Sequence, residues 1–275
     1  MLSQESDYLR ALYQNWTDRM TANPAMDLEG LRGIFEEWAE PTKEAEGVTY
    51  KSDSLAGIDA VWALPVDADN AKVLLYTHGG GFVTGSSSSH RKLAGHVAKA
   101  LGATAVVIDY RRAPEHVFPA QIDDATAVYK ELLARGYEAK NISTAGDSAG
   151  GNLAVASVLK FRELGLPLPS SVIAFSPWLD MQLTGSTLDS NDATDALVKR
   201  PVLEAMTSMF LAEQDETTNP LANPLHADFS VYPALYINAG GAETLLDDAR
   251  RLHSLASEAG VNSTLSIADG MQHVF

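Results

Sequence analysis

Gly146-Asp147-Ser148-Ala149-Gly150 is the stretch of this 275-residue chain that decides the fold. The apolar run 142–145 before it predicts a strand, and the pattern over 149–164 after it predicts a helix. A serine on so sharp a strand-to-helix turn has strained backbone geometry, and only glycine fits easily two residues to either side. The pattern is that of a nucleophile elbow, with the hydroxyl beside a helix N-terminus. A glycine-rich turn with a capping serine is the alternative interpretation.

Short apolar runs alternate with helical patterns on both sides of this turn. Strands are expected at 73–77, 105–108, 172–175, 234–239 and 264–268, and helices at about 91–101, 120–135 and 245–259. Continuous Val, Ile and Leu runs between helices are typical of parallel strands that are buried on both faces. The sequence therefore predicts an α/β fold with a mostly parallel, doubly wound sheet.

The two remaining regions have a different pattern. Amphipathic helices are expected at about 6–20 and 27–39, followed by a strand pair at 48–50 and 58–62. The stretch 179–233 carries one good helix, at about 201–211, between polar and proline-rich loops. We interpret it as an insertion over the carboxyl edge of the sheet, where such folds bind ligands. The expected organisation is N-terminal cap helices over 1–42 and a catalytic domain over 43–275, with its cap insertion at about 179–233.

The composition excludes several classes of protein. Twenty Lys and Arg residues against 36 Asp and Glu residues give a net charge of −16, which disfavours binding to nucleic acid and to anionic membranes. The chain has no cysteine, which excludes disulfides and a thiol nucleophile. The acidic N-terminus does not resemble a secretory signal, and no apolar run approaches the ~20 residues that span a bilayer. We expect a cytoplasmic protein without a membrane span.

A second glycine-rich segment, His78-Gly79-Gly80-Gly81-Phe82, follows the strand at 73–77. Consecutive glycines let the backbone direct several N–H groups at one point, as an oxyanion hole requires. Phosphate binding is the competing explanation, but Ser86 stands where the lysine of a phosphate-binding loop would be. His78 is expected to anchor the loop by hydrogen bonds.

A serine nucleophile needs a base, and seven histidines are available. His273 alone follows a strand through a short glycine-containing loop, which puts it at the carboxyl edge with Ser148. The histidines lack the spacing of metal ligands on a helix, so a metal site is not expected. The third member is a carboxylate between Ser148 and His273 in the chain. Glu243, directly after the strand at 234–239, is the favoured candidate, and Asp247 and Asp248 are its rivals.

Together these segments resemble the bacterial hormone-sensitive-lipase-like esterases of the α/β-hydrolase superfamily, from about residue 71 to 275. The motifs that carry the resemblance are His78-Gly79-Gly80-Gly81-Phe82, Asp109-Tyr110-Arg111-Arg112-Ala113-Pro114-Glu115-His116, Phe118-Pro119-Ala120, Gly146-Asp147-Ser148-Ala149-Gly150-Gly151-Asn152, Ser176-Pro177-Trp178 and Gly270-Met271-Gln272-His273. The resemblance implies an α/β-hydrolase fold with a helical cap and a carboxylic ester hydrolase without a cofactor. It puts Ser148 and His273 at the nucleophile and base positions.

The resemblance also assigns the oxyanion donors to the N–H groups of Gly80, Gly81 and Ala149. Three departures stand out. Glu243 occupies a position that is usually Asp, and Arg112 stands where Leu is common. Relatives continue through a closing helix beyond the position of His273, so one sheet face and the His273 loop are expected to lack cover here.

The resulting hypothesis is a serine esterase that hydrolyses small to medium uncharged esters through an acyl-enzyme. Aromatic residues of the cap segments favour an apolar substrate. A lactone hydrolase with the same triad is the first alternative, and a non-catalytic ligand-binding homologue is the second. The expected partner is a small-molecule ester or lactone, and a homodimer is left open.

Overall fold

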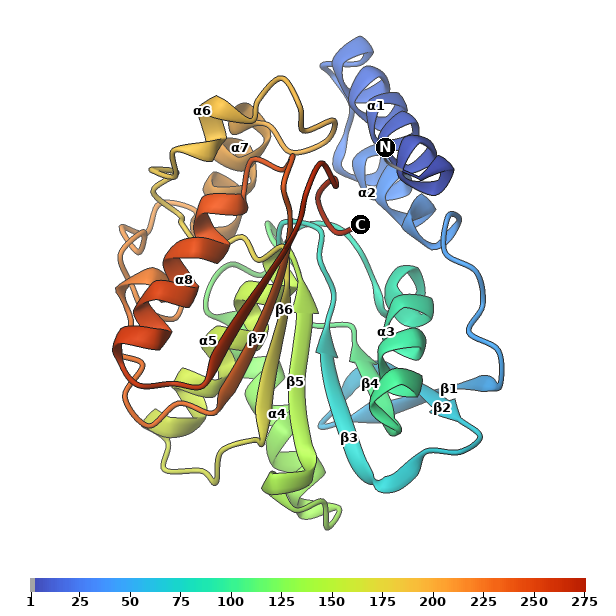
Figure 1. Ribbon diagram of the computed structural model, residues 1–275, viewed down its shortest axis with the longest axis vertical. Coiled ribbons are helices and arrows are strands. Elements are labelled where there is room, and N and C mark those ends of the chain that lie inside the picture. The colour runs from blue at the N-terminus through green and yellow to red at the C-terminus, as the bar shows by residue number, and fades with distance from the viewer. Residues whose placement is uncertain (1–2) are drawn as a thin grey trace.

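The computed structural model describes residues 3–275 and contains one eight-stranded sheet (Figure 1). Its strands are β1 (Val48–Leu55), β2 (Ile58–Pro65), β3 (Asp69–Thr77), β4 (Ala103–Ile108), β5 (Ile142–Asp147), β6 (Ser171–Phe175), β7 (Ala234–Gly240) and β8 (Ser263–Ala268). They lie in the order β1-β2-β4-β3-β5-β6-β7-β8. β2 is antiparallel to β1 and to β4, and all pairs from β4 to β8 are parallel. The predicted α/β class with a mostly parallel sheet is confirmed.

Helices cover both faces of the sheet. On one face α3 (Ser87–Leu101) packs its alanines on β2, β3 and β4. On the other face α4 (Ala120–Ala134), α5 (Ala149–Glu163) and α8 (Leu246–Glu258) share the main hydrophobic core. α5 is buried along most of its length because it lies under both α4 and the insertion. The nucleophile turn is therefore held between a buried strand and a buried helix.

The carboxyl ends of the six parallel strands lie along one edge of the sheet, at the top of Figure 1. The paired residues there include Thr77 with Gly146 and Gly240 with Ala268. The chain runs from β3 to β4 on one side and then returns to β5 on the other side of β3. This change of direction creates the crevice in which open α/β sheets bind ligands.

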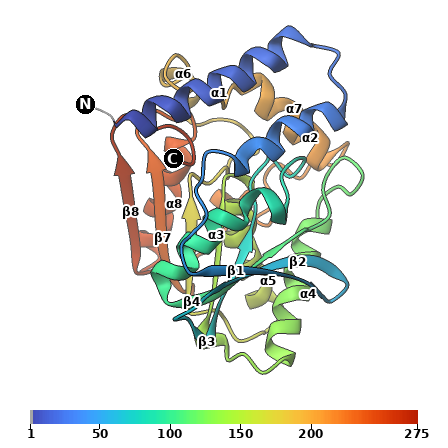
Figure 2. The same ribbon diagram turned by 90° about the vertical axis from the view of Figure 1, so that its right-hand side faces the viewer.

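Two groups of helices lie above this edge. α1 (Gln4–Ala22), α2 (Leu28–Glu36) and a 3₁₀ turn at Glu37–Ala39 come from the N-terminus, and α1 crosses above the strand ends (Figure 2). The insertion between β6 and β7 contributes α6 (Thr187–Ser190), α7 (Arg200–Leu211) and a 3₁₀ turn at Pro224–His226. The Thr17 hydroxyl donates a hydrogen bond to the carbonyl of Ala196 at 2.7 Å, which joins the two groups.

Most expected elements are confirmed within a few residues, and the differences have local causes. α3 begins at Ser87, four residues before its predicted start, because Ser86 and Ser89 form a reciprocal capping box. The 3₁₀ turn at Glu37–Ala39 falls within the helix predicted at about 27–39. α6 and the 3₁₀ turn at Pro224–His226 were not predicted, since segments of three or four residues carry no helical period.

The expectation that one sheet face and the His273 loop lack cover is partly wrong. On β7 and β8, Tyr236 and Ile267 are 40% and 41% exposed, so the sheet is incompletely covered there. His273, in contrast, is buried, because α1 packs on the loop that carries it.

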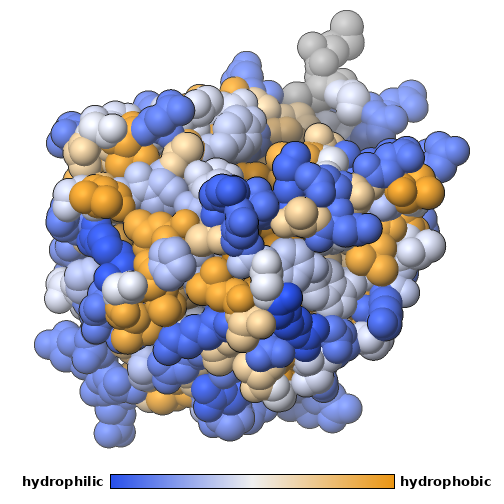
Figure 3. Space-filling view, turned by 90° about the horizontal axis from the view of Figure 1, so that it is seen from below, coloured by the Kyte–Doolittle hydropathy of each residue, from blue (hydrophilic) through white to orange (hydrophobic). Residues whose placement is uncertain are grey.

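The face opposite the cap carries hydrophobic residues in small groups separated by hydrophilic ones (Figure 3). Across residues 3–275, every helix is too short or too polar to cross a lipid bilayer.

Candidate active site

The turn between β5 and α5 has the strained geometry that its sequence predicts. Ser148 has φ 52° and ψ −122°, a conformation that costs a residue with a Cβ on the order of 1–3 kcal/mol. A Cβ on Gly146 would lie 2.2 Å from the carbonyl oxygen of Gly150, and one on Gly150 would lie 2.0 Å from that of Thr77. The two glycines therefore permit β3, β5 and α5 to approach closely enough to present Ser148 at the carboxyl edge.

The glycine loop after β3 is fixed beside this turn by Asp147. One carboxylate oxygen of Asp147 accepts hydrogen bonds from the Tyr76 hydroxyl at 2.7 Å and from the N–H of Gly79 at 3.2 Å. The other lies 3.2 Å from Nε2 of His90. Burial alone would raise the pKa of Asp147, but its contacts with His90 and Tyr76 outweigh burial and lower it. Gly80 and Gly81 follow with φ values of 107° and 63°, which favour glycine.

His78 supports the loop from below. Its ring stacks on Tyr110 with the ring centres 4.2 Å apart, and its Nδ1 lies 2.8 Å from the carbonyl oxygen of Gly79. Burial, together with the nearby His90, lowers the pKa of His78 to about 3. The ring is therefore neutral at ordinary pH and lies outside the cavity that contains Ser148. This arrangement agrees with the expected anchoring role.

The acid and base candidates meet on the neighbouring strands. Nδ1 of His273 lies 2.8 Å from Oε2 of Glu243, and Oε1 of Glu243 accepts the N–H of Gly240 at 3.1 Å. Both side chains are buried. Burial raises the pKa of Glu243. Burial would lower the pKa of His273, but the hydrogen bond and the charge of Glu243 outweigh it, and the pKa of His273 is raised.

The rival carboxylates point elsewhere. Asp247 accepts the N–H of Ser186 at 3.0 Å, and Asp248 accepts the N–H groups of Leu179 and Asp180 at 2.7 and 2.9 Å. Both aspartates therefore organise the insertion, and Glu243 is the carboxylate in contact with His273.

The segment around His273 is held mainly by side chains. The buried Tyr13 hydroxyl on α1 donates a hydrogen bond to the carbonyl of His273 at 2.9 Å. The next residue, Val274, donates its N–H to Oγ of Ser176 at 3.0 Å. On the other side, Gln272 accepts the N–H of Ala196 at 2.8 Å and donates to the carbonyl of Thr194. The N-terminal helix and the insertion thus both contact the loop of the candidate base.

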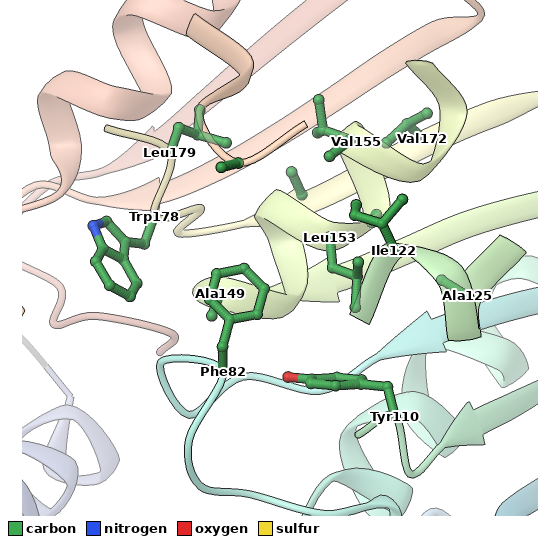
Figure 4. Packing of buried hydrophobic residues seen from close by; sticks show 14 of the residues in the cluster. Phe82, Tyr110, Ile122, Ala125, Ala149, Leu153, Val155, Val172, Trp178 and Leu179 are labelled. Carbon is green, nitrogen blue, oxygen red and sulfur yellow. The ribbon is translucent and has the colours of Figure 1, made fainter. Parts of the chain in front are cut away.

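One small cavity of about 30 Å³ contains Ser148, Gly80, Gly81 and His273 in its lining. Its remaining walls are apolar: Met20, Phe35, Trp38, Trp178, Leu197, Val198, Val202, Leu203 and Met206. Below it, Phe82 and Trp178 pack at the start of α5 near Ala149, with ring centres 6.2 Å apart (Figure 4). A hydroxyl, an imidazole backed by a carboxylate, and glycine N–H groups in an apolar cavity are the parts that acyl transfer requires.

Side chains that commonly bind metals are not gathered around this cavity in the part of the chain that the structure describes. Within residues 3–275, His, Asp and Glu side chains form no cluster of three or more that could hold a metal ion. A larger hollow of about 410 Å³ lies between α1 and the C-terminal segment, but none of the candidate site residues lines it.

The predicted residues thus come together from four strands, while several supporting residues were missed. Tyr13 lies about 260 positions from the loop it holds, and the sequence carries no signal for such a contact. Asp147 lies inside the quoted elbow, so its position next to Ser148 was a usable signal. Ser176 was noted only as part of a motif. The apolar pattern predicted α7, but it did not show that Met206 is the residue of this helix next to Gly81.

Comparison with known proteins agrees with this architecture. Residues 74–275 match a family model described as the alpha/beta hydrolase fold. The chain is 39% identical over 216 residues to an acetyl-hydrolase of Streptomyces hygroscopicus, covering 78% of this chain and 72% of that protein. It is 31% identical over 245 residues to an esterase of Acinetobacter venetianus, covering 89% and 80%.

Among solved structures, an esterase from the bacterial hormone-sensitive lipase family superposes with a TM-score of 0.94 at 36% identity. The alignment covers 100% of this chain and 91% of that one. The sequence match and the shared architecture extend over the sheet, the glycine loop and the elbow. The chain belongs to the α/β-hydrolase family and, within it, to the group of bacterial hormone-sensitive-lipase-like esterases.

Proposed function

We propose that this protein hydrolyses small to medium uncharged carboxylic esters through an acyl-enzyme formed on Ser148. The observation that carries the proposal is the shared lining of one apolar cavity by Ser148, Gly80, Gly81 and His273, with Glu243 hydrogen-bonded to the far side of the imidazole. Similarity to proteins named esterase and acetyl-hydrolase supports the same reaction class.

In the first step Oγ of Ser148 attacks the ester carbonyl carbon, and Nε2 of His273 takes the hydroxyl proton. Glu243 holds Nδ1–H of the ring, which keeps Nε2 free to accept that proton and stabilises the imidazolium that results. The bond from the carbonyl carbon to the alcohol oxygen then breaks. The alcohol leaves with the proton that His273 returns, and the acyl group remains on Ser148.

In the second step water replaces the alcohol. His273 takes a proton from water as the water oxygen attacks the acyl carbon, and the bond to Oγ of Ser148 breaks. Ser148 recovers its proton from His273, and the carboxylic acid is released.

The negative charge that develops on the carbonyl oxygen needs hydrogen-bond donors. The N–H groups of Gly80 and Gly81, together with that of Ala149 at the start of α5, are our candidates. The first N–H groups of a helix have no intrahelical partner and carry the positive end of its dipole. The Asp147 contact that holds Gly79 keeps the loop in place before charge develops. Loss of one such donor typically costs ~3–4 kcal/mol of transition-state stabilisation.

The cap contributes the rest of the cavity. We infer that residues 1–42 and the insertion at about 179–233 act together as a lid over the catalytic domain, because both supply apolar walls of the cavity. The apolar walls favour an uncharged substrate, and the net charge of −16 disfavours an anionic one.

Ser148→Ala tests the proposal directly. With p-nitrophenyl acetate and butyrate, we expect the parent enzyme to be active and the variant to lose at least 10³-fold in kcat. An organophosphate should label the parent at Ser148 and leave the variant unlabelled. Unchanged turnover in the variant, at matched thermal stability, would overturn the assignment.

A further inference from the structure

Met206 is a side chain of the insertion that lies directly against Gly81 of the glycine loop. It lies on α7, is only 5% exposed, and lines the cavity together with Ser148. A Cβ on Gly81 would lie 2.0 Å from Sδ of Met206 and 3.0 Å from its Cε. The thioether therefore occupies the space that any side chain at position 81 would fill.

The backbone of α7 is fixed relative to that loop one turn further along. The Phe210 ring stacks on Phe82 with the ring centres 4.0 Å apart, and the Phe210 carbonyl accepts the N–H of Phe118 at 2.9 Å. All three residues are buried. Moving Met206 away by shifting the helix would break these contacts, so the space above Gly81 changes most easily by rotation of the Met206 side chain, which is flexible.

The cavity is too small for a long acyl chain as it stands. A volume of about 30 Å³ is an order of magnitude below the roughly 300–1,000 Å³ of typical small-molecule pockets. Each further methylene of an acyl chain requires space that Met206 and its apolar neighbours now occupy.

Building on the proposed function, we propose that Met206 is the residue that sets the acyl-chain length of the substrate, and that it selects for acetyl and other very short acyl groups. Replacing Met206 with Ala removes three heavy atoms beyond Cβ. The freed space should admit about three more acyl carbons, and one methylene in such a pocket changes kcat/KM by roughly 10- to 200-fold.

The test compares kcat/KM for p-nitrophenyl acetate, butyrate, hexanoate and octanoate. Since these esters share one alcohol, the series changes only the acyl chain. In M206A we expect the ratio of hexanoate to acetate to rise at least tenfold, and in M206F we expect it to fall below the parent value. M209A is the matched control, because Met209 lies on the same helix, is partly buried, and does not line the cavity. Its ratio should equal that of the parent.

The outcomes separate the two proposals. Parent activity that survives in S148A overturns the esterase mechanism and this inference with it. Activity that depends on Ser148, together with a hexanoate-to-acetate ratio unchanged in both M206A and M206F, overturns only the role of Met206. The same holds if M209A shifts the ratio as much as M206A does. If M206A does not fold, the fall expected in M206F still decides the question.

Discussion

The two halves of the candidate site are built in different ways. On the side of the nucleophile, Ser148 and the glycine loop are placed by backbone contacts that only glycine allows, such as the approach of Gly150 to Thr77. On the side of the base, Glu243 and His273 lie on loops that are joined to their surroundings through side-chain hydrogen bonds. The position of the nucleophile half thus depends on close backbone packing, and that of the base half depends on a few side-chain hydrogen bonds.

The halves also differ in how they respond to pH. The pKa of His78 is lowered to about 3 and that of Asp147 is lowered as well, so both keep one charge state around neutral pH. The pKa values of Glu243 and His273 are both raised. Under the proposed mechanism, we therefore expect the loop of the oxyanion donors to respond little to pH and the charge state of His273 to set the rate.

Gly150→Ala should produce the largest effect, because it disrupts the close backbone packing that places Ser148 and the glycine loop. The added methyl group would lie 2.0 Å from the carbonyl oxygen of Thr77 and 2.5 Å from that of His78, and both are backbone atoms that cannot move independently. We expect a loss of more than ~4 kcal/mol in the free energy of unfolding, measured by urea denaturation, with no detectable esterase activity.

Gly33→Ala is the matched control for that variant. Gly33 is also a helical glycine, it is exposed, and a Cβ there meets no atom within 4 Å. The control should gain roughly 0.5–1 kcal/mol of stability, because alanine favours the helix. A folded, active G150A would show that close backbone approach does not hold the nucleophile turn.

Glu243→Gln acts on the second half and should leave the fold intact. The amide cannot hold the imidazolium as a carboxylate does, so we expect kcat to fall by on the order of 10³–10⁴. The pH profile should also move. His273 works as a base only when neutral, and loss of the Glu243 charge removes the interaction that raises its pKa. The acid limb of kcat/KM should therefore shift to lower pH.

Asp247→Asn is the control for this loss of charge. It removes one carboxylate of the same segment whose hydrogen bond goes to Ser186 and not to His273. The control should keep the parent profile. An acid limb that stays in place in E243Q, or moves equally in D247N, would contradict the assignment of Glu243.

The first half was largely predictable from the sequence. The spacing of Gly146, Ser148 and Gly150 between a strand and a helix encodes the turn, because the steric requirement acts over two residues. The glycine loop has the same local character. The mostly parallel sheet and the position of His273 at its carboxyl edge followed from the alternation of strands and helices, and the structure confirms the parallel pairing of the strands from β4 to β8. The order of the strands was not predicted, because it depends on contacts between distant segments.

The second half was less predictable because its contacts are distant in the chain. Apolar periodicity predicted α1 and α7, but it does not say which residue of each helix contacts the site. The positions of Tyr13 and Met206 depend on how the cap docks, which the packing of the whole molecule decides. The expected exposure of the His273 loop was wrong for the same reason.

Tyr13→Phe should give the smallest effect, and it tests whether the cap positions the base. The substitution keeps the ring that packs 5.5 Å from Trp16 and 5.6 Å from Trp38. It removes only the hydroxyl that donates to the carbonyl of His273. Loss of such a bond leaves a buried carbonyl unpaired, at a cost of ~1–3 kcal/mol. We expect a lower Tm and, because His273 loses part of its support, a kcat reduced by up to about tenfold with KM little changed.

Tyr129→Phe separates positioning from stability. The Tyr129 hydroxyl donates to the carbonyl of Pro167 at 2.6 Å and its ring is stacked on Phe161, on the α4–α5 side of the core. Its loss should lower Tm to a similar degree and leave kcat at the parent value. If Y13F and Y129F change kcat equally, the contact between Tyr13 and His273 is structural only. A fall confined to Y13F would mean that the N-terminal helix positions the base, because the two variants differ in which carbonyl loses its donor.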